Sequence, residues 1–237
     1  MPETRAGAPR VTDAEVDAFR LAPGFTCAST ACGLKPSGKP DLLWVLADTA
    51  CAAAGVFTTN RVAAAPVQLD REHLQRAAGR IRAVVANSGC ANAVTGERGL
   101  ADARRTATLA AESLGLDPEQ VLVLSTGVIG VFLDMEKITR GIAALGGPGA
   151  RRGPGDAARA ITTTDTVTKI ATLEVDMPRG TVRVAGFAKG AGMIHPDMAT
   201  MLAVVTTDAR IEPVRLARAL RAAVAGSFNR ISVDGDM

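Results

Sequence analysis

The stretch KGAGMIHPDMATMLAVVTTD, residues 189–208, joins a glycine-rich loop to a short apolar run. Glycine and proline in its first half permit sharp backbone turns that regular structure forbids. The run Met201–Val205 that follows is typical of a strand covered on both faces. Thr200 stands at the joint, where its hydroxyl can be held rigidly and reached from the loop. If the bond between Ala199 and Thr200 were broken, Thr200 would become an N-terminal nucleophile.

The composition is that of an ordinary globular protein, with 47% hydrophobic and 22% charged residues in a chain of 237. Global disorder is therefore excluded, and the length allows one large domain or two small ones. An aromatic content of 3% without any Tyr argues against nucleic-acid binding by base stacking. The net charge of +3 is too small to indicate a polyanionic partner. We expect no nucleic-acid partner.

The cysteines and the N-terminal sequence point to a reduced, water-soluble protein. The four cysteines form no CxxC pair and only two histidines accompany them, so we expect neither a metal site nor disulfides. No basic-then-apolar leader opens the chain. The most apolar window, Leu42–Phe57, is interrupted by Asp48 and is short for a bilayer. These observations predict a cytoplasmic protein with no membrane segment.

Hydrophobic periodicity and capping residues predict alternating strands and helices. The expected strands are 42–46, 55–57, 81–86, 121–124, 171–177, 181–187, 201–205 and 231–233, and the expected helices are 100–116, 134–145, 156–161 and 213–225. Because hairpins are mixed with the alternation, we expect a mixed, layered α/β architecture rather than a doubly wound parallel sheet. The glycine-containing turns match no phosphate-binding motif, and no internal repeat is apparent.

Six ordered blocks carry a family resemblance. Residues 189–202, KGAGMIHPDMATML, closely resemble the self-cleaving motif of the ornithine acetyltransferase (bifunctional glutamate N-acetyltransferase) family of arginine biosynthesis. The other blocks, in the family's order, are GVFTTNRVAAAPV (55–67), NSGCANAVTG (87–96), STGVIG (125–130), AITTTDT (160–166) and FNRISVDGD (228–236). The resemblance therefore spans the chain from about Gly24 onward.

The resemblance implies a fold and a domain organisation. The fold would be α/β, with mixed sheets in α/β/β/α layers and a self-cleaving threonine nucleophile. Residues 1–23 would be a polar N-terminal lead-in and residues 24–237 the family domain. Cleavage would divide the chain into an alpha chain, 1–199, and the start of a beta chain, 200–237. The family pattern continues beyond Asp236, so its downstream acidic substrate-binding residue has no counterpart in these residues.

The resemblance also implies an activity. An acetyl group would pass from N2-acetylornithine to glutamate through an acetyl-Thr200 intermediate, within the cyclic arginine pathway. Glutamate acetylation from acetyl-CoA would be a second reaction, with acetyl-CoA as a co-substrate and no bound cofactor. The alpha and beta chains would form a heterodimer that assembles into a heterotetramer.

The site residues follow from the same resemblance, position by position. Thr200 would be the nucleophile, and the bond between Ala199 and Thr200 the cleavage site. Thr126 and Gly127 would form the oxyanion hole, which Gly127→Pro would test by deleting one N–H donor. Lys189 would pair with the substrate carboxylate, and Thr163 would contact the substrate, together with Thr200.

Several alternatives stay open on the sequence alone. Thr164 could take the place of Thr163, because three threonines precede Asp165, which could simply order its turn. His195 and three asparagines, Asn60, Asn87 and Asn92, are expected to be structural. Two further functions compete: a related self-processing N-terminal-nucleophile hydrolase or aminopeptidase, and an inactive truncated remnant that serves as a binding piece.

Overall fold

The first half of the chain builds a four-stranded sheet. The computed structural model describes residues 11–197 and 200–236. The sheet contains β1 (Phe25–Thr30), β2 (Leu42–Ala52), β3 (Arg80–Cys90) and β4 (Val121–Val128), in the order β1-β2-β3-β4. The first three strands are antiparallel, whereas β3 and β4 are parallel because α3 (Gly96–Leu114) carries the chain back between them.

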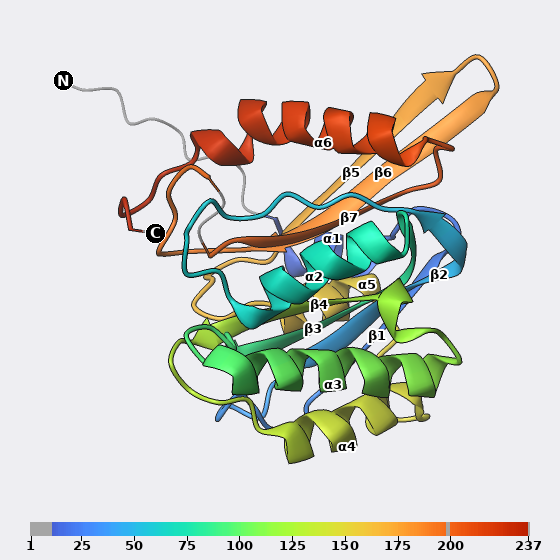
Figure 1. Ribbon diagram of the computed structural model, residues 1–237. Coiled ribbons are helices and arrows are strands. Elements are labelled where there is room, and N and C mark those ends of the chain that lie inside the picture. Colours follow the sequence, from blue (N-terminus) through green and yellow to red (C-terminus); the bar gives the residue numbers. More distant parts are fainter. Residues whose placement is uncertain (1–10, 198–199, 237) are drawn as a thin grey trace.

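Two helices, α3 and α4 (Met135–Gly146), cover the outer face of this sheet (Figure 1). The buried stripe of α3 consists largely of alanines at helical spacing, so the helix can lie close to the strands. Gly115, with φ +66°, ends α3, and the Asp134 side chain accepts a hydrogen bond from the Lys137 amide at the start of α4. Both helices confirm the sequence prediction.

The second half builds a three-stranded antiparallel sheet. Its strands are β5 (Lys169–Met177), β6 (Gly180–Lys189) and β7 (Leu202–Thr207), in the order β5-β6-β7. The predicted hairpin is present as β5 and β6, and it projects beyond the rest of the molecule (Figure 1). The helix α6 (Pro213–Gly226) lies outermost on this side. The predicted strand 231–233 is absent: a short 3-10 helix, Phe228–Arg230, is followed by irregular backbone.

The two sheets face each other across a shared core. Leu43 and Val45 of β2 pack in one cluster with Ala185 and Phe187 of β6. The helix α5 (Pro154–Ala160) contributes to this cluster and packs against α1 (Asp13–Ala18). The layers are therefore helices, sheet, sheet and helix, which is the α/β/β/α order expected.

A helix not predicted from the sequence, α2 (Ala65–Arg76), lies along β4, the edge of the first sheet. Its buried Asp70 accepts a hydrogen bond from the Val123 amide at 2.7 Å. Its buried His73 pairs through Nδ1 with the Val121 carbonyl at 2.8 Å. Side chains of α2 thus provide hydrogen-bond partners for backbone groups of β4 that lack a neighbouring strand.

Other departures from the sequence prediction have local causes. The expected strand 42–46 continues to Ala52 as β2, whose register shifts between Leu46 and Cys51, and the expected strand 55–57 is irregular backbone instead. Strand β3 continues through the turn expected after residue 86, because β4 pairs with it there. The lead-in 1–23 is not wholly polar surface: α1 is fixed by a capping box at Thr12, and Phe19 and Leu21 are buried. Strand β1 was also not predicted.

No helix in residues 11–197 and 200–236 is long and apolar enough to cross a membrane.

Candidate active site

Thr200 lies at the end of the loop between β6 and β7, two residues before β7 begins. Its hydroxyl donates to the Met193 carbonyl oxygen at 2.5 Å and lies 3.3 Å from that of Gly192. A hydroxyl that donates its hydrogen to a carbonyl keeps its lone pairs available for attack. Ala199, the other side of the expected cleavage site, lies outside the described residues.

The backbone of this loop is strained. Met193, Asp197 and Thr200 all have positive φ, at 52°, 73° and 53°. The left-handed conformation costs an L-residue about 1–2 kcal/mol, and Thr200 is also β-branched. Three such residues within eight positions place stored strain next to the expected cleavage site.

The C-terminal segment holds this loop in place. The Asp234 carboxylate accepts hydrogen bonds from the Met193 amide at 2.6 Å and the Ile194 amide at 3.0 Å. The Asn229 side-chain oxygen accepts one from the Asp197 amide at 3.3 Å. Residues far apart in sequence thereby fix the loop that carries Thr200.

Lys189 ends β6 and is only 5% exposed. Burial lowers the pKa of its ammonium, nearby Asp165 raises it, and Lys169 lowers it; the net effect is a lowered pKa. A buried cation of this kind can gain much from a carboxylate that replaces lost hydration. The position suits the predicted role of binding a substrate carboxylate.

Asp165 joins the two predicted substrate-binding segments. Its Oδ1 accepts hydrogen bonds from the Gly190 amide at 2.8 Å and from Lys169 Nζ at 2.6 Å, and its Oδ2 accepts one from the Thr163 amide at 3.2 Å. Burial opposes ionisation, but the Lys169 hydrogen bond and the two amides outweigh it, so the pKa of Asp165 is lowered. The threonine turn is therefore tied to the Lys189–Gly190 corner. Thr163 and Thr164 are both exposed, so their burial does not choose between them.

Thr126 and Gly127 lie near the end of β4, opposite the last residues of β3. Thr126 is buried, and Gly127 has φ +134°. A Cβ at Gly127 would lie 2.6 Å from the Cys90 amide nitrogen. Only glycine therefore allows the backbone to follow this course, and β4 becomes exposed from Gly127 onward.

A shared acceptor connects the end of the first sheet to the threonine segment. Ser88, the β3 partner of Thr126, donates its hydroxyl to the Ala160 carbonyl at 2.5 Å. Lys35 Nζ donates to the same carbonyl at 2.9 Å. Ala160 ends α5 and stands just before the threonine run, so these two donors set where that run begins. Neither donor was singled out in the sequence.

The profile of a family described as ArgJ matches residues 26–237. The chain belongs to the ArgJ family. A relative from Symbiobacterium thermophilum named "Arginine biosynthesis bifunctional protein ArgJ" is 50% identical over 215 residues, covering 90% of this chain and 53% of that protein. A relative of the same name from Chlorobaculum tepidum is 48% identical over 228 residues, covering 96% of this chain and 56% of its own. The chain thus spans about half the length of these curated relatives.

Two crystal structures confirm the fold. The arginine biosynthesis bifunctional protein argJ from Bacillus halodurans matches with a TM-score of 0.69 and 39% identity, covering 75% of this chain and 92% of that one. The ornithine acetyltransferase of Mycobacterium tuberculosis, complexed with ornithine, matches with a TM-score of 0.67 and 39% identity, over 76% and 94% of the two chains. The layered ornithine acetyltransferase fold expected from the sequence is confirmed.

The structure brings the predicted ArgJ-type residues into two groups. Thr163, Lys189 and the Thr200 loop share the region around Asp165, while Thr126 and Gly127 lie on the first sheet. No hydrogen bond within the described ranges joins Thr200 to Thr126 or Gly127.

The three asparagines are structural, as expected: their side chains bond to neighbouring groups in turns and at the end of β3, namely Asn60 to Val62, Asn87 to Ser125 and Cys90, and Asn92 to Thr95 and Gly99.

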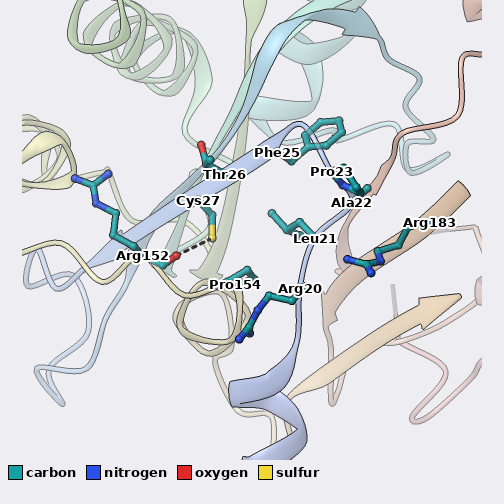
Figure 2. Close-up of a pocket in the computed structure, with 10 residues that line it drawn as sticks. All are labelled: Arg20, Leu21, Ala22, Pro23, Phe25, Thr26, Cys27, Arg152, Pro154 and Arg183. Atoms are coloured by element: carbon teal, nitrogen blue, oxygen red, sulfur yellow. Dashed lines mark hydrogen bonds between the residues drawn. The ribbon is translucent and has the colours of Figure 1, made fainter. Parts of the chain in front are cut away.

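A cavity of about 520 Å³ lies elsewhere, beside β1 (Figure 2). None of the predicted site residues lines it. Arg183 reaches it from β6, but its guanidinium already pairs with Glu174 at 2.7 Å. The four cysteines are free, and burial raises the pKa of Cys27, which lines the cavity, to about 11. Because its pKa is raised, the Cys27 thiol is not a reactive thiolate near neutral pH, and Arg20 and Arg152 are the other basic residues that line the cavity.

Proposed function

We propose that this chain carries the nucleophile half of an acetyltransferase that moves an acetyl group from N2-acetylornithine to glutamate in arginine biosynthesis. The observation that carries the proposal is the Thr200 hydroxyl, oriented on a strained loop that begins at the buried cation of Lys189. Family membership supports the same reaction class. Because the chain spans about half of its relatives' length, the complete activity would need the remaining half as well.

The first step would be self-cleavage. Thr200 Oγ1 would attack the carbonyl carbon of Ala199, forming a C–O bond while the C–N bond breaks. The nitrogen would leave as the Thr200 α-amine and take up the hydroxyl proton. Water would then hydrolyse the ester, giving an Ala199 carboxylate and restoring the Thr200 hydroxyl. The freed amine, with an ordinary pKa near 8, would serve as the general base for the later steps.

Acetyl transfer would use the same hydroxyl twice. Thr200 would take the acetyl group from acetylornithine, releasing ornithine, and then pass it to the α-amine of glutamate. Hydrogen-bond donors of Thr126, its hydroxyl included, and the Gly127 amide would stabilise the oxyanion that forms in each half-reaction. Lys189 would bind the α-carboxylate that both substrates share, and Thr163 would contact the substrate beside it.

The wider setting is proposed on the same basis. Acetyl-CoA would act as an alternative acetyl donor and not as a bound cofactor. The cleaved chains would stay together as an alpha/beta heterodimer, assembled into a heterotetramer in the cytoplasm.

Intact-mass measurement of the purified chain tests the nucleophile. We expect fragments 1–199 and 200–237 from the wild type and only the whole chain from Thr200→Ala. Thr108→Ala, on the exposed side of α3, is the matched control and should cleave normally. Cleavage that persists in Thr200→Ala would rule out the proposed nucleophile.

A second assay tests the transfer reaction. The processed chain, with the remaining half of the family's length supplied in trans, should transfer acetyl groups from acetylornithine to glutamate. Cleavage of peptide amides without transfer would indicate a hydrolase instead. No turnover of either substrate would indicate a remnant.

A further inference from the structure

The loop before Thr200 is held from outside by two side chains of the C-terminal segment, Asp234 and Asn229, which together we name the loop clamp. Figure 1 shows this segment beside the β6–β7 loop. The clamp lies outside the groups that the proposed reaction uses. Its contacts nevertheless converge on the backbone that carries the nucleophile.

The clamp binds the amides of the strained residues. Asp234 accepts from the amide of Met193, which has φ 52°, and Asn229 accepts from the amide of Asp197, which has φ 73°. A left-handed residue persists only where its surroundings fix it. Each strained residue that precedes Thr200 in the described loop thus has its own external hydrogen bond.

The clamp also sets the position of the Thr200 hydroxyl. The Met193 carbonyl accepts that hydroxyl, while the Met193 amide is bound to Asp234. Asp234 holds the Ile194 amide with its second oxygen, and the Val233 amide donates to the Ile194 carbonyl at 3.0 Å. If these contacts are lost, the acceptor of the Thr200 hydroxyl moves with the loop.

We infer that Asp234, assisted by Asn229, is a positioning residue for self-cleavage: it keeps the loop strained and the Thr200 hydroxyl aligned. This inference rests on the proposed self-cleavage at Thr200. The residue takes no part in bond making or breaking and acts only through the backbone of Met193 and Ile194.

The test uses the whole 237-residue chain and Asp234→Asn. Whichever way the amide is turned, its NH2 group faces the Met193 or the Ile194 amide, so one acceptor is lost and two donors oppose each other. We expect cleavage at least about tenfold slower, followed by intact mass over time. Asp234→Glu keeps two acceptor oxygens and should recover part of the rate. Asp236→Asn makes the same charge change two residues away, at a carboxylate that accepts no hydrogen bond in the described ranges, and should cleave normally.

Asn229 offers a second matched pair. Asn229→Asp keeps the acceptor for the Asp197 amide, whereas Asn229→Leu removes it, so only the leucine variant should slow cleavage. Wild-type rates in both Asp234→Asn and Asn229→Leu would overturn the inference, and so would equal slowing in Asp236→Asn.

Hydrogen exchange tests the positioning role of Asp234 independently of cleavage. In uncleaved chain, Asp234→Asn should speed exchange of the Met193 and Ile194 amides by about tenfold or more while leaving β3 and β4 unchanged. Unchanged exchange at residues 192–197 would overturn the inference even if the wild type does not cleave. Cleavage that persists in Thr200→Ala would rule out Thr200 as the nucleophile. It would not bear on how Asp234 holds the loop, because the exchange experiment does not involve the Thr200 hydroxyl.

Discussion

At the scale of single residues, Lys189 is a buried charge that lowers the stability of the fold. Its ammonium is almost fully buried, and within the described ranges it makes no ion pair of its own. Burial lowers its pKa because the charged form loses hydration, although Asp165 partly offsets this and Lys169 adds to it. A group with such a lowered pKa destabilises the fold while it is charged, and the penalty is relieved as pH rises through the lowered value toward 10.5.

Lys189→Met keeps the apolar stem and removes the buried charge. We therefore expect a higher melting temperature than the wild type at neutral pH, by roughly 2–4 °C. The difference should shrink in alkaline buffer, because the wild-type lysine loses its proton there. In the processed enzyme the same variant should weaken both substrates, raising each apparent KM about tenfold to a hundredfold.

Thermal melts at pH 7 and pH 10 measure the change in melting temperature, and steady-state kinetics measure the change in KM. The exposed Lys137→Met is the control for a general effect of removing a lysine. A lower melting temperature in Lys189→Met would show that the ammonium stabilises the fold instead. Loss of self-cleavage with unchanged KM values would make Lys189 a processing residue.

At the scale of elements, α2 and β4 depend on a carboxyl group that resists ionisation. Burial raises the pKa of Asp70 well above its usual value, and the Val123 amide only partly lowers it. The folded chain therefore binds a proton more tightly than the unfolded chain. Its stability contribution is largest below the ordinary carboxyl range and falls as pH rises toward the raised pKa.

Asp70→Asn keeps the acceptor for the Val123 amide and never ionises. We expect this variant to exceed the wild type in free energy of unfolding by about 1–2 kcal/mol at pH 7, and the two to converge near pH 4. Urea denaturation at both pH values measures the difference. Asp70→Ala, which loses the acceptor, should be less stable at both. A less stable Asp70→Asn at pH 7 would show that the carboxylate is charged and well solvated in the fold.

The last residues of β4 change the test that the sequence suggested. Proline holds φ near about −65°, whereas Gly127 has φ +134°, so Gly127→Pro would disrupt the backbone as well as delete a donor. Even Gly127→Ala would place Cβ against Cys90. Loss of activity in either variant would not identify an oxyanion donor. Thr126→Val, which preserves shape and removes a hydroxyl, is the more informative change.

At the scale of the whole molecule, the core between the two sheets positions the backbone of the candidate site. Phe187 is 2% exposed in that core and lies two residues before Lys189 on β6. Its packing against the first sheet fixes β6, and with it the Lys189–Gly190 corner that Asp165 binds. The contacts of Phe187 in this core therefore contribute both to the stability of the fold and to the position of Lys189.

Phe187→Ala should lower the free energy of unfolding by about 3–5 kcal/mol, because it leaves a cavity between the sheets. Leu173→Ala, 60% exposed on the projecting hairpin, is the control and should change it by less than about 0.5 kcal/mol. Urea denaturation measures both. A small effect of Phe187→Ala would show that the second sheet is held by something other than this core.

Some of this architecture follows from the sequence alone. The helices α3, α4 and α6 and the β5–β6 hairpin have local signals: apolar spacing, Gly115, Asp134, Pro213 and the Pro178–Gly180 turn. The layered fold was predicted from ordered motifs across the chain. The site residues named from those motifs remain predictions; the structure shows that Asp165 ties the Thr163 amide to the Gly190 amide, next to Lys189.

Other features were decided only by tertiary structure. Helix α2 has little local pattern and exists because Asp70 and His73 satisfy the edge of β4. No strand forms at 231–233; this segment lies against the loop that precedes Thr200, and Asp234 next to it accepts hydrogen bonds from two amides of that loop. A sequence pattern reports which side chains face a core, because burial repeats with the period of the element. It does not report which distant backbone groups need partners, since that need arises only when the chain has folded.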